Sequence, residues 1–193
     1  MPPEPTTPSA RQTELLEAAY RYTLEHGIAD MSLRPLAAAI GSSPRVLVFL
    51  FGNKDGLVRA LLARARADEL AMLERLGPAA DGEPVGLAMA VERVWAWLAA
   101  KEHRPLLRLW AEAYTRSLVE PEGAWAGFAA STVEDWLAVM AQCQPPRERR
   151  SKEGATQRTL ALAVLRGALL DLLATGAERR TGAAVNQYIV SNM

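Results

Sequence analysis

Basic side chains gather in one short segment of this chain, and they are its clearest chemical signal. Between Met31 and Ala67 a single acid, Asp55, faces six bases, which are Arg34, Arg45, Lys54, Arg59, Arg64 and Arg66. A guanidinium group can read guanine through two hydrogen bonds, and a lysine can hold a phosphate. Because the whole chain is balanced, with 22 basic and 22 acidic residues, this local excess predicts a surface for a polyanion such as nucleic acid.

Residue types used in catalysis and metal binding are scarce. Two histidines and one cysteine, Cys143, cannot fill a conventional zinc site or form an intramolecular disulfide. The sequence also contains no Glu-x-x-His, Gly-x-Ser-x-Gly or Gly-x-Gly-x-x-Gly motif and no phosphate-binding lysine loop. We therefore expect neither an enzyme nor a metal or other cofactor, and we expect Cys143 to be a buried spectator.

The composition is that of a folded globular protein. Of its 193 residues, 50% are hydrophobic and 23% are charged, which is enough apolar material for a real core. The proline- and threonine-rich beginning has no basic and apolar signal pattern, and no apolar run is long enough to span a membrane. With a single cysteine, these features favour a cytoplasmic protein that begins with a flexible arm, residues 1–10.

The elements that must position the basic residues are helices, because apolar residues recur at spacings of three and four and do not alternate. The fold class predicted is all-α. Serine, asparagine, proline and glycine punctuate the beginning of the chain at the places where helices usually begin and end. They predict four helices, between Ser9 and Gly27, Ser32 and Gly41, Pro44 and Gly52, and Asn53 and Leu76.

A linker is predicted over Gly77–Pro84, and it divides the chain into a first domain, residues 11–77, and a second, residues 78–193. The second domain should contain longer helices near Val85–Lys101, Arg104–Leu118, Pro121–Cys143, Gly154–Thr175 and Thr181–Ser191. Between two of these, the charged and proline-containing run Gln144–Glu153 is expected to be a mobile loop.

Two short helices joined by a glycine turn already describe a helix-turn-helix. The order and spacing of residues from Arg11 to Leu62 are a more specific signal. This segment resembles the N-terminal domain of the TetR family of bacterial transcriptional regulators. The landmarks that carry the resemblance are Leu15-Leu-x-Ala-Ala19, Gly27, Ser32-Leu-x-x-Leu-Ala37, Gly41 and Phe51-Gly-Asn-Lys-Asp-Gly-Leu57. The resemblance implies a three-helix DNA-binding domain followed by a helical domain for ligand binding and dimerisation.

Residues that occupy the DNA-contacting positions of the family motif are expected to contact DNA in this chain as well. The resemblance assigns base or phosphate contact to residues at the start of the second helix, of the recognition helix and of the fourth helix, namely Arg34, Ser43, Pro44, Arg45 and Lys54. The chain departs from the family pattern at two positions. Val48 stands where tyrosine is frequent in the family, and Leu50 stands where histidine is frequent. Phe49, between them, can still contact a thymine methyl. The plainer alternative is that Arg34 and Arg45 are solvated surface charges.

A weaker match, Leu165–Gly176, looks like the penultimate helix of the family, which usually forms the dimer interface with the last helix. The resemblance therefore implies a homodimer. We expect its interface to include Leu165, Gly167, Ala168, Leu169 and Leu172, because apolar residues surround more of this helix than one core requires.

The second domain is rich in large aromatic residues at helical spacing. As core residues they need no ligand, but together they favour an apolar pocket for a small hydrophobic or aromatic ligand. The candidate ligand contacts are Met89, Trp95, Trp110, Tyr114, Trp125, Phe128 and Trp136.

The resulting hypothesis is a dimeric regulator, by family default a repressor, that binds a palindromic operator and is released by its ligand. The alternative is a helical dimer that binds a ligand or a partner and whose helix-turn-helix has decayed, as Val48 and Leu50 suggest.

Overall fold

The structure is a computed structural model that describes residues 9–76 and 84–192. In these residues the chain is helical and contains no strand. The helices are α1 (Ala10–His26), α2 (Leu33–Ala39), α3 (Pro44–Phe51), α4 (Lys54–Leu76), α5 (Leu87–Ala99), α6 (Arg104–Val119), α7 (Phe128–Cys143), α8 (Pro146–Arg150), α9 (Lys152–Thr175) and α10 (Glu178–Asn192), with 3-10 turns η1 (Lys101–His103) and η2 (Gly123–Trp125).

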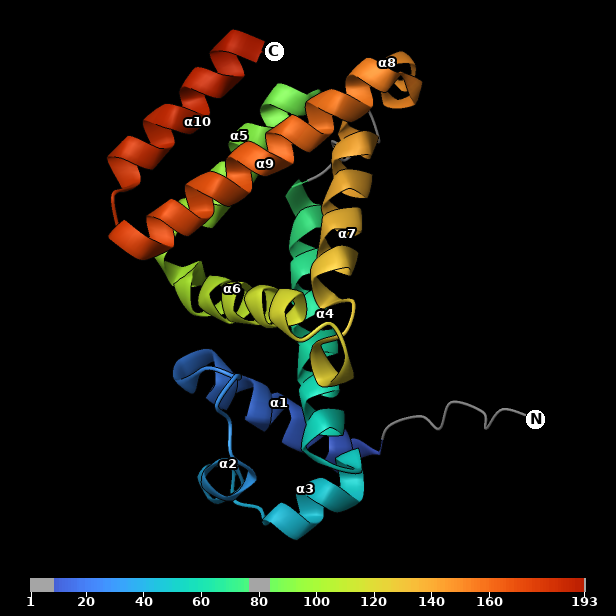
Figure 1. Cartoon of the computed structure of the whole chain (residues 1–193), viewed down its shortest axis with the longest axis vertical. Helices are drawn as coiled ribbons and strands as arrows, with labels where there is room; N and C mark the ends of the chain where they lie inside the picture. Colours follow the sequence, from blue (N-terminus) through green and yellow to red (C-terminus); the bar gives the residue numbers. More distant parts are fainter. Residues whose placement is uncertain (1–8, 77–83, 193) are drawn as a thin grey trace, which may run out of the picture.

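The molecule is elongated, with different helices at its two ends (Figure 1). The first three helices lie together at one end, and α5, α9 and α10 lie at the other. The long helix α4 begins beside α3 and runs toward the other end, where α7 lies alongside it, and α6 crosses between the two groups. None of the described helices is by itself long and apolar enough to cross a membrane, although α2 and α3 taken together, bent by 103°, have the length and composition.

Side-chain caps place the starts of α1, α3 and α4 where the sequence predicts them. The side chain of Ser9 accepts a hydrogen bond from the Gln12 amide at 3.2 Å, and that of Ser43 accepts one from the Val46 amide at 3.3 Å. At the start of α4 the Asn53 side chain accepts from the Gly56 amide at 2.7 Å. These side chains satisfy amide groups that the helix itself leaves unpaired, so the predicted helix starts are confirmed.

The junction of α3 and α4 depends on Gly56. A Cβ atom at this position would lie 1.9 Å from the carbonyl oxygen of Phe51. No side chain fits in that space, so a glycine is required for the chain to turn from the recognition helix into α4 this tightly.

Two predictions in the second domain are wrong. The segment Pro121–Cys143 is not one helix, because η2 and a left-handed turn at Gly127 (φ 74°) precede α7. The run Gln144–Glu153 is not a loop, because it contains α8, which packs on α9. Gln144, the first residue of this run, is fully buried; it donates a hydrogen bond to the Gly154 carbonyl and accepts one from Arg158. The predicted arm and linker lie largely outside the described residues.

Cys143 is buried, as expected, at the end of α7. Its carbonyl oxygen accepts a hydrogen bond from the Gly86 amide at 2.8 Å, which joins the end of α7 to the start of α5. Burial raises the pKa of the Cys143 thiol, and the positive charges of Arg93 and Arg149 offset this only in part.

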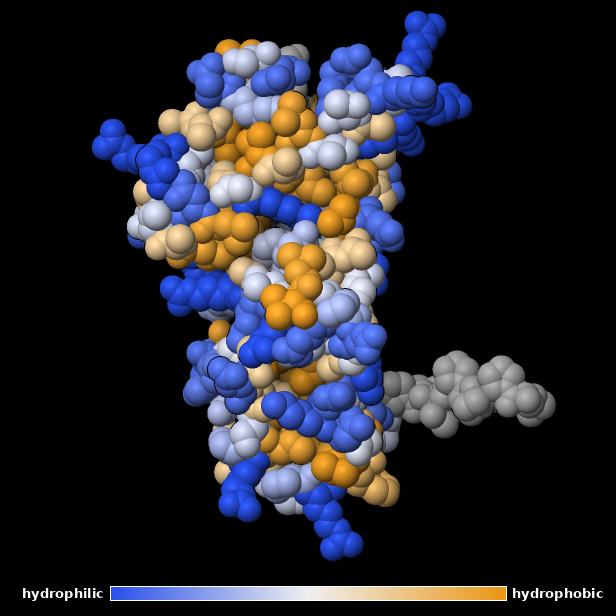
Figure 2. Space-filling model, in the orientation of Figure 1, coloured by the Kyte–Doolittle hydropathy of each residue, from blue (hydrophilic) through white to orange (hydrophobic). Residues whose placement is uncertain are grey.

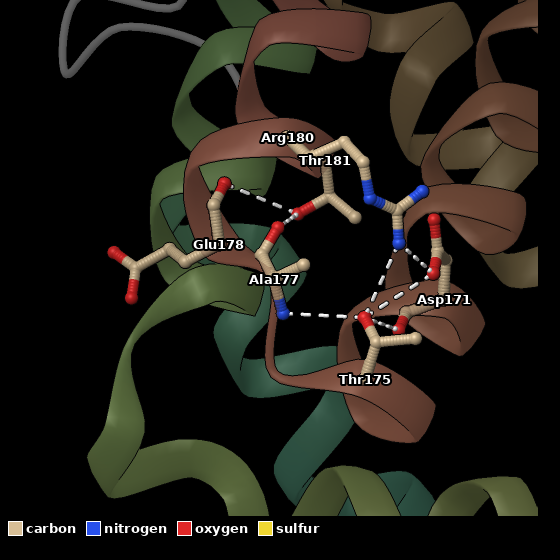
Figure 3. Close-up of polar contacts among 6 residues, drawn as sticks. All are labelled: Asp171, Thr175, Ala177, Glu178, Arg180 and Thr181. Carbon is tan, nitrogen blue, oxygen red and sulfur yellow. Dashed lines mark hydrogen bonds and ion pairs between the residues drawn. The ribbon is translucent and has the colours of Figure 1, made fainter.

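The turn between α9 and α10 is closed by a polar cluster (Figure 3). Arg180 pairs with Asp171 at 2.6 Å across the turn, and the Thr175 hydroxyl accepts a hydrogen bond from the Ala177 amide at 3.2 Å. Thr181 donates its hydroxyl to the Ala177 carbonyl at 3.0 Å. These contacts fix the direction in which α10 returns along α9.

The two ends of the molecule are joined by a carboxylate on α6. Glu112 accepts hydrogen bonds at 2.9 Å from the backbone amides of Ile28 and Ala29, which follow α1. Ile28 itself is completely buried. A charged acceptor for two neighbouring amides gives stronger hydrogen bonds than a neutral one, so the loop after α1 is held to α6.

We expect Glu112→Ala to lower the free energy of unfolding by about 2 kcal/mol, because two amides lose a charged acceptor. The matched control, directly after the same helix, is Glu120→Ala, which removes an exposed ion pair with Arg116. That control should change the stability by less than about 1 kcal/mol. Urea unfolding followed by circular dichroism measures both, and equal effects would show that Glu112 is only a surface charge.

Candidate nucleic-acid interface and ligand cavity

The six predicted DNA contacts are brought to one end of the molecule. Arg34 lies in the first turn of α2, Ser43 to Arg45 begin α3, and Lys54 begins α4. With Phe49, on α3, all of them are exposed to solvent. Their contact with DNA stays a prediction, but none of them is needed to fill the core.

The recognition helix α3 has one inward and one outward face. Leu47 is buried, and Phe51 packs against the core from a partly buried position, as expected. Val46 and Val48 face outward, and Phe49 is 85% exposed. A large apolar side chain on a surface that also carries bases can contact the methyl group of a thymine.

The basic excess of the first domain is smaller at the surface than in the sequence. Arg64 pairs with Glu17 and Asp68 and stacks over the Tyr20 ring. Arg66 forms a two-point ion pair with Asp135 of α7, at 2.6 and 2.9 Å. Arg64 therefore joins α1 to α4 within the first domain, and Arg66 joins α4 to α7 of the second. The bases left at the exposed end are Arg34, Arg45, Lys54 and Arg59.

A cavity lies among α4, α5, α6, α7 and α9, with a volume of about 30 Å³. Three predicted ligand contacts line it, namely Trp110, Phe128 and Trp136. A fourth, Tyr114, does not line it but packs against Trp110, with the ring centres 5.0 Å apart. Most of the remaining lining is apolar, which suits a hydrophobic ligand.

The other predicted ligand contacts do not line this cavity. Met89 is 42% exposed, and Trp95 lines a separate surface cleft between α5 and α10. Trp125 is buried in η2, which packs against α4. Because residues two positions apart on a helix point in nearly opposite directions, Trp97 reaches the cavity and Trp95 does not.

Two charged cavity residues were missed by the sequence analysis. Glu69 of α4 is 7% exposed and accepts a hydrogen bond from the Trp136 indole nitrogen. Its burial raises its pKa to about 7, although that hydrogen bond and the charge of Arg166 act in the opposite direction. Arg166 of α9 lies over the rings of Tyr114 and Trp110, with its Cζ atom 5.0 and 5.8 Å from their centres. No sequence motif marked either residue.

The predicted dimer contacts divide between two faces of α9. Leu165, Leu169 and Leu172 point into the core and are at most 3% exposed, so their assignment to an interface is wrong. Ala168 is partly buried, and Gly167 is exposed. The outward face of α9 carries exposed small and apolar residues spaced by three and four, which are Leu160, Ala163, Gly167, Leu170 and Ala174. Figure 2 shows apolar residues gathered over this helix.

Comparison with known proteins identifies the N-terminal domain. Residues 15–61 match the model of the family described as "Bacterial regulatory proteins, tetR family". A search of curated proteins gave no match.

Solved structures share the fold over nearly the whole chain. A putative TetR-family transcriptional regulator from Rhodococcus sp. is 18% identical with a TM-score of 0.71, and the match covers 94% of this chain and 100% of that one. A transcriptional regulator from Rhodococcus sp. Rha1 is 20% identical with a TM-score of 0.73, covering 92% and 93%.

The multidrug binding protein EbrR, complexed with proflavin, is 26% identical with a TM-score of 0.67, and the match covers 91% of this chain and 96% of that one. The family match falls on the exposed helix-turn-helix, and the shared fold extends through the cavity-bearing helices. Residues 15–61 therefore form a helix-turn-helix segment of the TetR-family type, and the chain as a whole shares the fold of solved TetR-family regulators.

Proposed function

We propose that the chain is a ligand-responsive repressor that binds a palindromic operator as a homodimer and leaves it when a small hydrophobic or aromatic ligand fills the cavity. The observation that carries the proposal is the course of α4. This helix begins at the exposed basic end and contributes Ala65, Glu69 and Met72 to the cavity wall. One rigid element thus contacts both sites.

In this proposal α3 enters the major groove. Arg45 reads a base edge, Phe49 contacts a thymine methyl, and Arg34 contacts a base or a phosphate. Ser43 and Pro44 bring the first turn of α3 close to the DNA backbone, and Lys54 holds a phosphate beside the first amides of α4.

In the proposed mechanism, ligand binding and DNA binding favour two different conformations of the protein. The change between them is transmitted through α4 and α6. Leu106, Leu107 and Trp110 of α6 line the cavity, and Glu112, further along the same helix, binds the loop after α1. A ligand that separates α6 from α4 moves the DNA-binding domain in each subunit. The distance between the two recognition helices then no longer matches one fixed spacing of operator half-sites.

The dimer is proposed to form through α9 and α10. The exposed residues of α9 at heptad-like spacing let a second copy pack closely, and Gly167 offers no side chain to keep two helices apart. On α10, Val190 is 81% exposed and extends the apolar surface. The first domain would comprise residues 11–77, with residues 78–193 forming the ligand and dimer domain.

The proposed ligand class is supported by the aromatic lining of the cavity and by EbrR, whose structures contain proflavin and malachite green. In the proposed role the protein acts in the cytoplasm, binds operator DNA as its partner and catalyses no reaction.

The exposed Val48 and the partly buried Leu50 favour one rival, a dimer whose helix-turn-helix no longer binds DNA specifically. Binding to a fragment of the protein's own promoter region separates the two. We expect binding that weakens with salt and is absent for scrambled DNA, and failure of this binding would leave the rival standing.

On a DNA sequence selected by the purified protein, Arg45→Ala should lower specific affinity by about 1–3 kcal/mol and relax the base preference at one position per half-site. Lys54→Ala should weaken binding to all sequences alike and reduce the salt slope by about one unit. Arg108→Ala, which removes an exposed arginine from α6, is the control and should do neither. If base preference survives in Arg45→Ala, that residue is not a reader.

Leu170→Glu should convert the dimer to a monomer, because two buried carboxylates would face each other near the symmetry axis. Leu118→Glu changes another exposed leucine, at the end of α6, and should leave the dimer intact. Analytical ultracentrifugation measures the oligomeric state, and operator binding should weaken together with dimerisation. A Leu170→Glu protein that stays dimeric would place the interface elsewhere.

A further inference from the structure

Three hydrogen-bond donors at the cavity lack acceptors. The Nε and Nη2 atoms of Arg166 and the Nε1 atom of Trp110 are buried and have no hydrogen-bond partner within residues 9–76 and 84–192. Buried donors are nearly always paired in native proteins, and buried N–H groups without an acceptor are unfavourable. This cluster therefore requires an explanation.

The guanidinium of Arg166 is held in place, but not all of its hydrogen-bond donors have acceptors. Its Nη1 atom donates a hydrogen bond to the Tyr114 hydroxyl at 3.2 Å, and the group lies over the rings of Tyr114 and Trp110. Contact with ring faces offsets part of the loss of hydration, but it gives the Nε and Nη2 hydrogens no acceptor. Arg166 and Trp110 both line the cavity, so their unpaired donors are close to the space that a ligand would occupy.

The carboxylate in the cavity wall does not neutralise Arg166. Glu69 forms no ion pair with it among the described contacts, and one Glu69 oxygen is already bonded to Trp136. Burial and the neighbouring Asp135 of α7 raise the pKa of Glu69 to about 7, against the effects of Trp136, Arg166 and Arg66. Asp135 is itself paired with Arg66. Near neutral pH much of Glu69 is therefore protonated, and Arg166 lacks a full counter-charge.

We infer that the cavity takes an anionic ligand, a carboxylate on a flat apolar or aromatic body, whose oxygens accept hydrogen bonds from Arg166 and Trp110. Guanidinium groups suit this role because two of their N–H groups match the two oxygens of a carboxylate. The body of the ligand would lie against Trp97, Phe128 and Trp136, which line the same cavity. The inference rests on the proposed ligand-responsive function and narrows the class of its ligand.

The cavity volume of about 30 Å³ adds a mechanical consequence. An aromatic carboxylate is larger than this space, so its entry must displace the surrounding side chains. Trp110 belongs to α6 and Arg166 to α9, whereas Glu69 belongs to α4. Binding at Arg166 and Trp110 would thus change the separation of α6 from α4, which is the movement that the repressor proposal requires.

The test is calorimetric titration of the full-length dimer, without DNA, with benzoate, 2-naphthoate and indole-3-acetate and with the neutral amide of each. At least one carboxylate should bind, and at least about tenfold more tightly than its amide. Arg166→Met should weaken that binding by about 30-fold or more, whereas Arg108→Met, at an exposed arginine of α6, should not change it. Trp110→Phe, which removes the indole donor and keeps a smaller aromatic ring, should weaken it severalfold. The comparison of carboxylate with amide uses the unaltered protein, so it decides the question even if Arg166→Met does not fold.

The pH dependence gives a second readout. Carboxylate binding should tighten as the pH falls from about 8 to about 6, because Glu69 becomes neutral while the probes stay ionised. In Glu69→Gln this dependence should disappear. A wild-type affinity that does not change over this range would contradict the placement of the anion beside Glu69.

Three results would overturn the inference: no carboxylate binding at millimolar concentration, equal binding of carboxylates and amides, or preferential binding of the cation proflavin that is lost in Glu69→Gln. Failure of the repressor proposal is recognised separately, because it is measured on operator DNA. A protein that binds carboxylates through Arg166 but binds no DNA would refute the regulator and leave the anion site in place.

Discussion

One continuous helix has to pack against both domains along a single hydrophobic core, and the rest of the molecule is arranged around this constraint. The first half of α4 buries Leu57 and Leu61 against the DNA-binding helices, and its second half buries Met72 and Leu73 in the other domain. A helix of 23 residues is about 35 Å long and does not bend easily. Close packing at both ends means that a change at one end is accommodated by moving the helix as a whole. The ion pair of Arg66 with Asp135 and the contacts of Glu112 strengthen the same connection.

Features set by local chemistry could be predicted from the sequence. Ser9, Ser43 and Asn53 cap helices through neighbours three residues away, so the starts of α1, α3 and α4 need no knowledge of the fold. The inward position of Leu47 follows from the same register. Features decided by packing could not be predicted. Leu165 and Leu170 are equally apolar, but one fills the core and the other faces solvent. Likewise, the polar run Gln144–Glu153 contains α8, and the packing of α8 against α9 has no local signal in the sequence.

In the cavity, too, some features could be predicted from the sequence and others are decided only by packing. An excess of aromatic residues signals an apolar pocket, but it does not distinguish Trp97 from Trp95, which lie on different sides of α5. Glu69 and Arg166 were invisible to motif analysis because neither belongs to a recognisable motif, and only the crossing of α4, α6 and α9 brings them to one wall. Charge counting had a similar limit, since Arg64 and Arg66 belong to the positive segment of the sequence but are used within the protein.

The buried thiol at the junction of α7 and α5 makes this protein convenient for spectroscopy. The chain has one cysteine, and its side chain is 1% exposed with a raised pKa, so it should react slowly with maleimides and other thiol reagents. A second cysteine introduced at an exposed position of α3 would therefore take up a probe selectively, without removal of the native residue. In a symmetric dimer this gives one pair of labels, one on each recognition helix. Electron spin resonance on that pair would measure their separation directly in the free and ligand-bound forms.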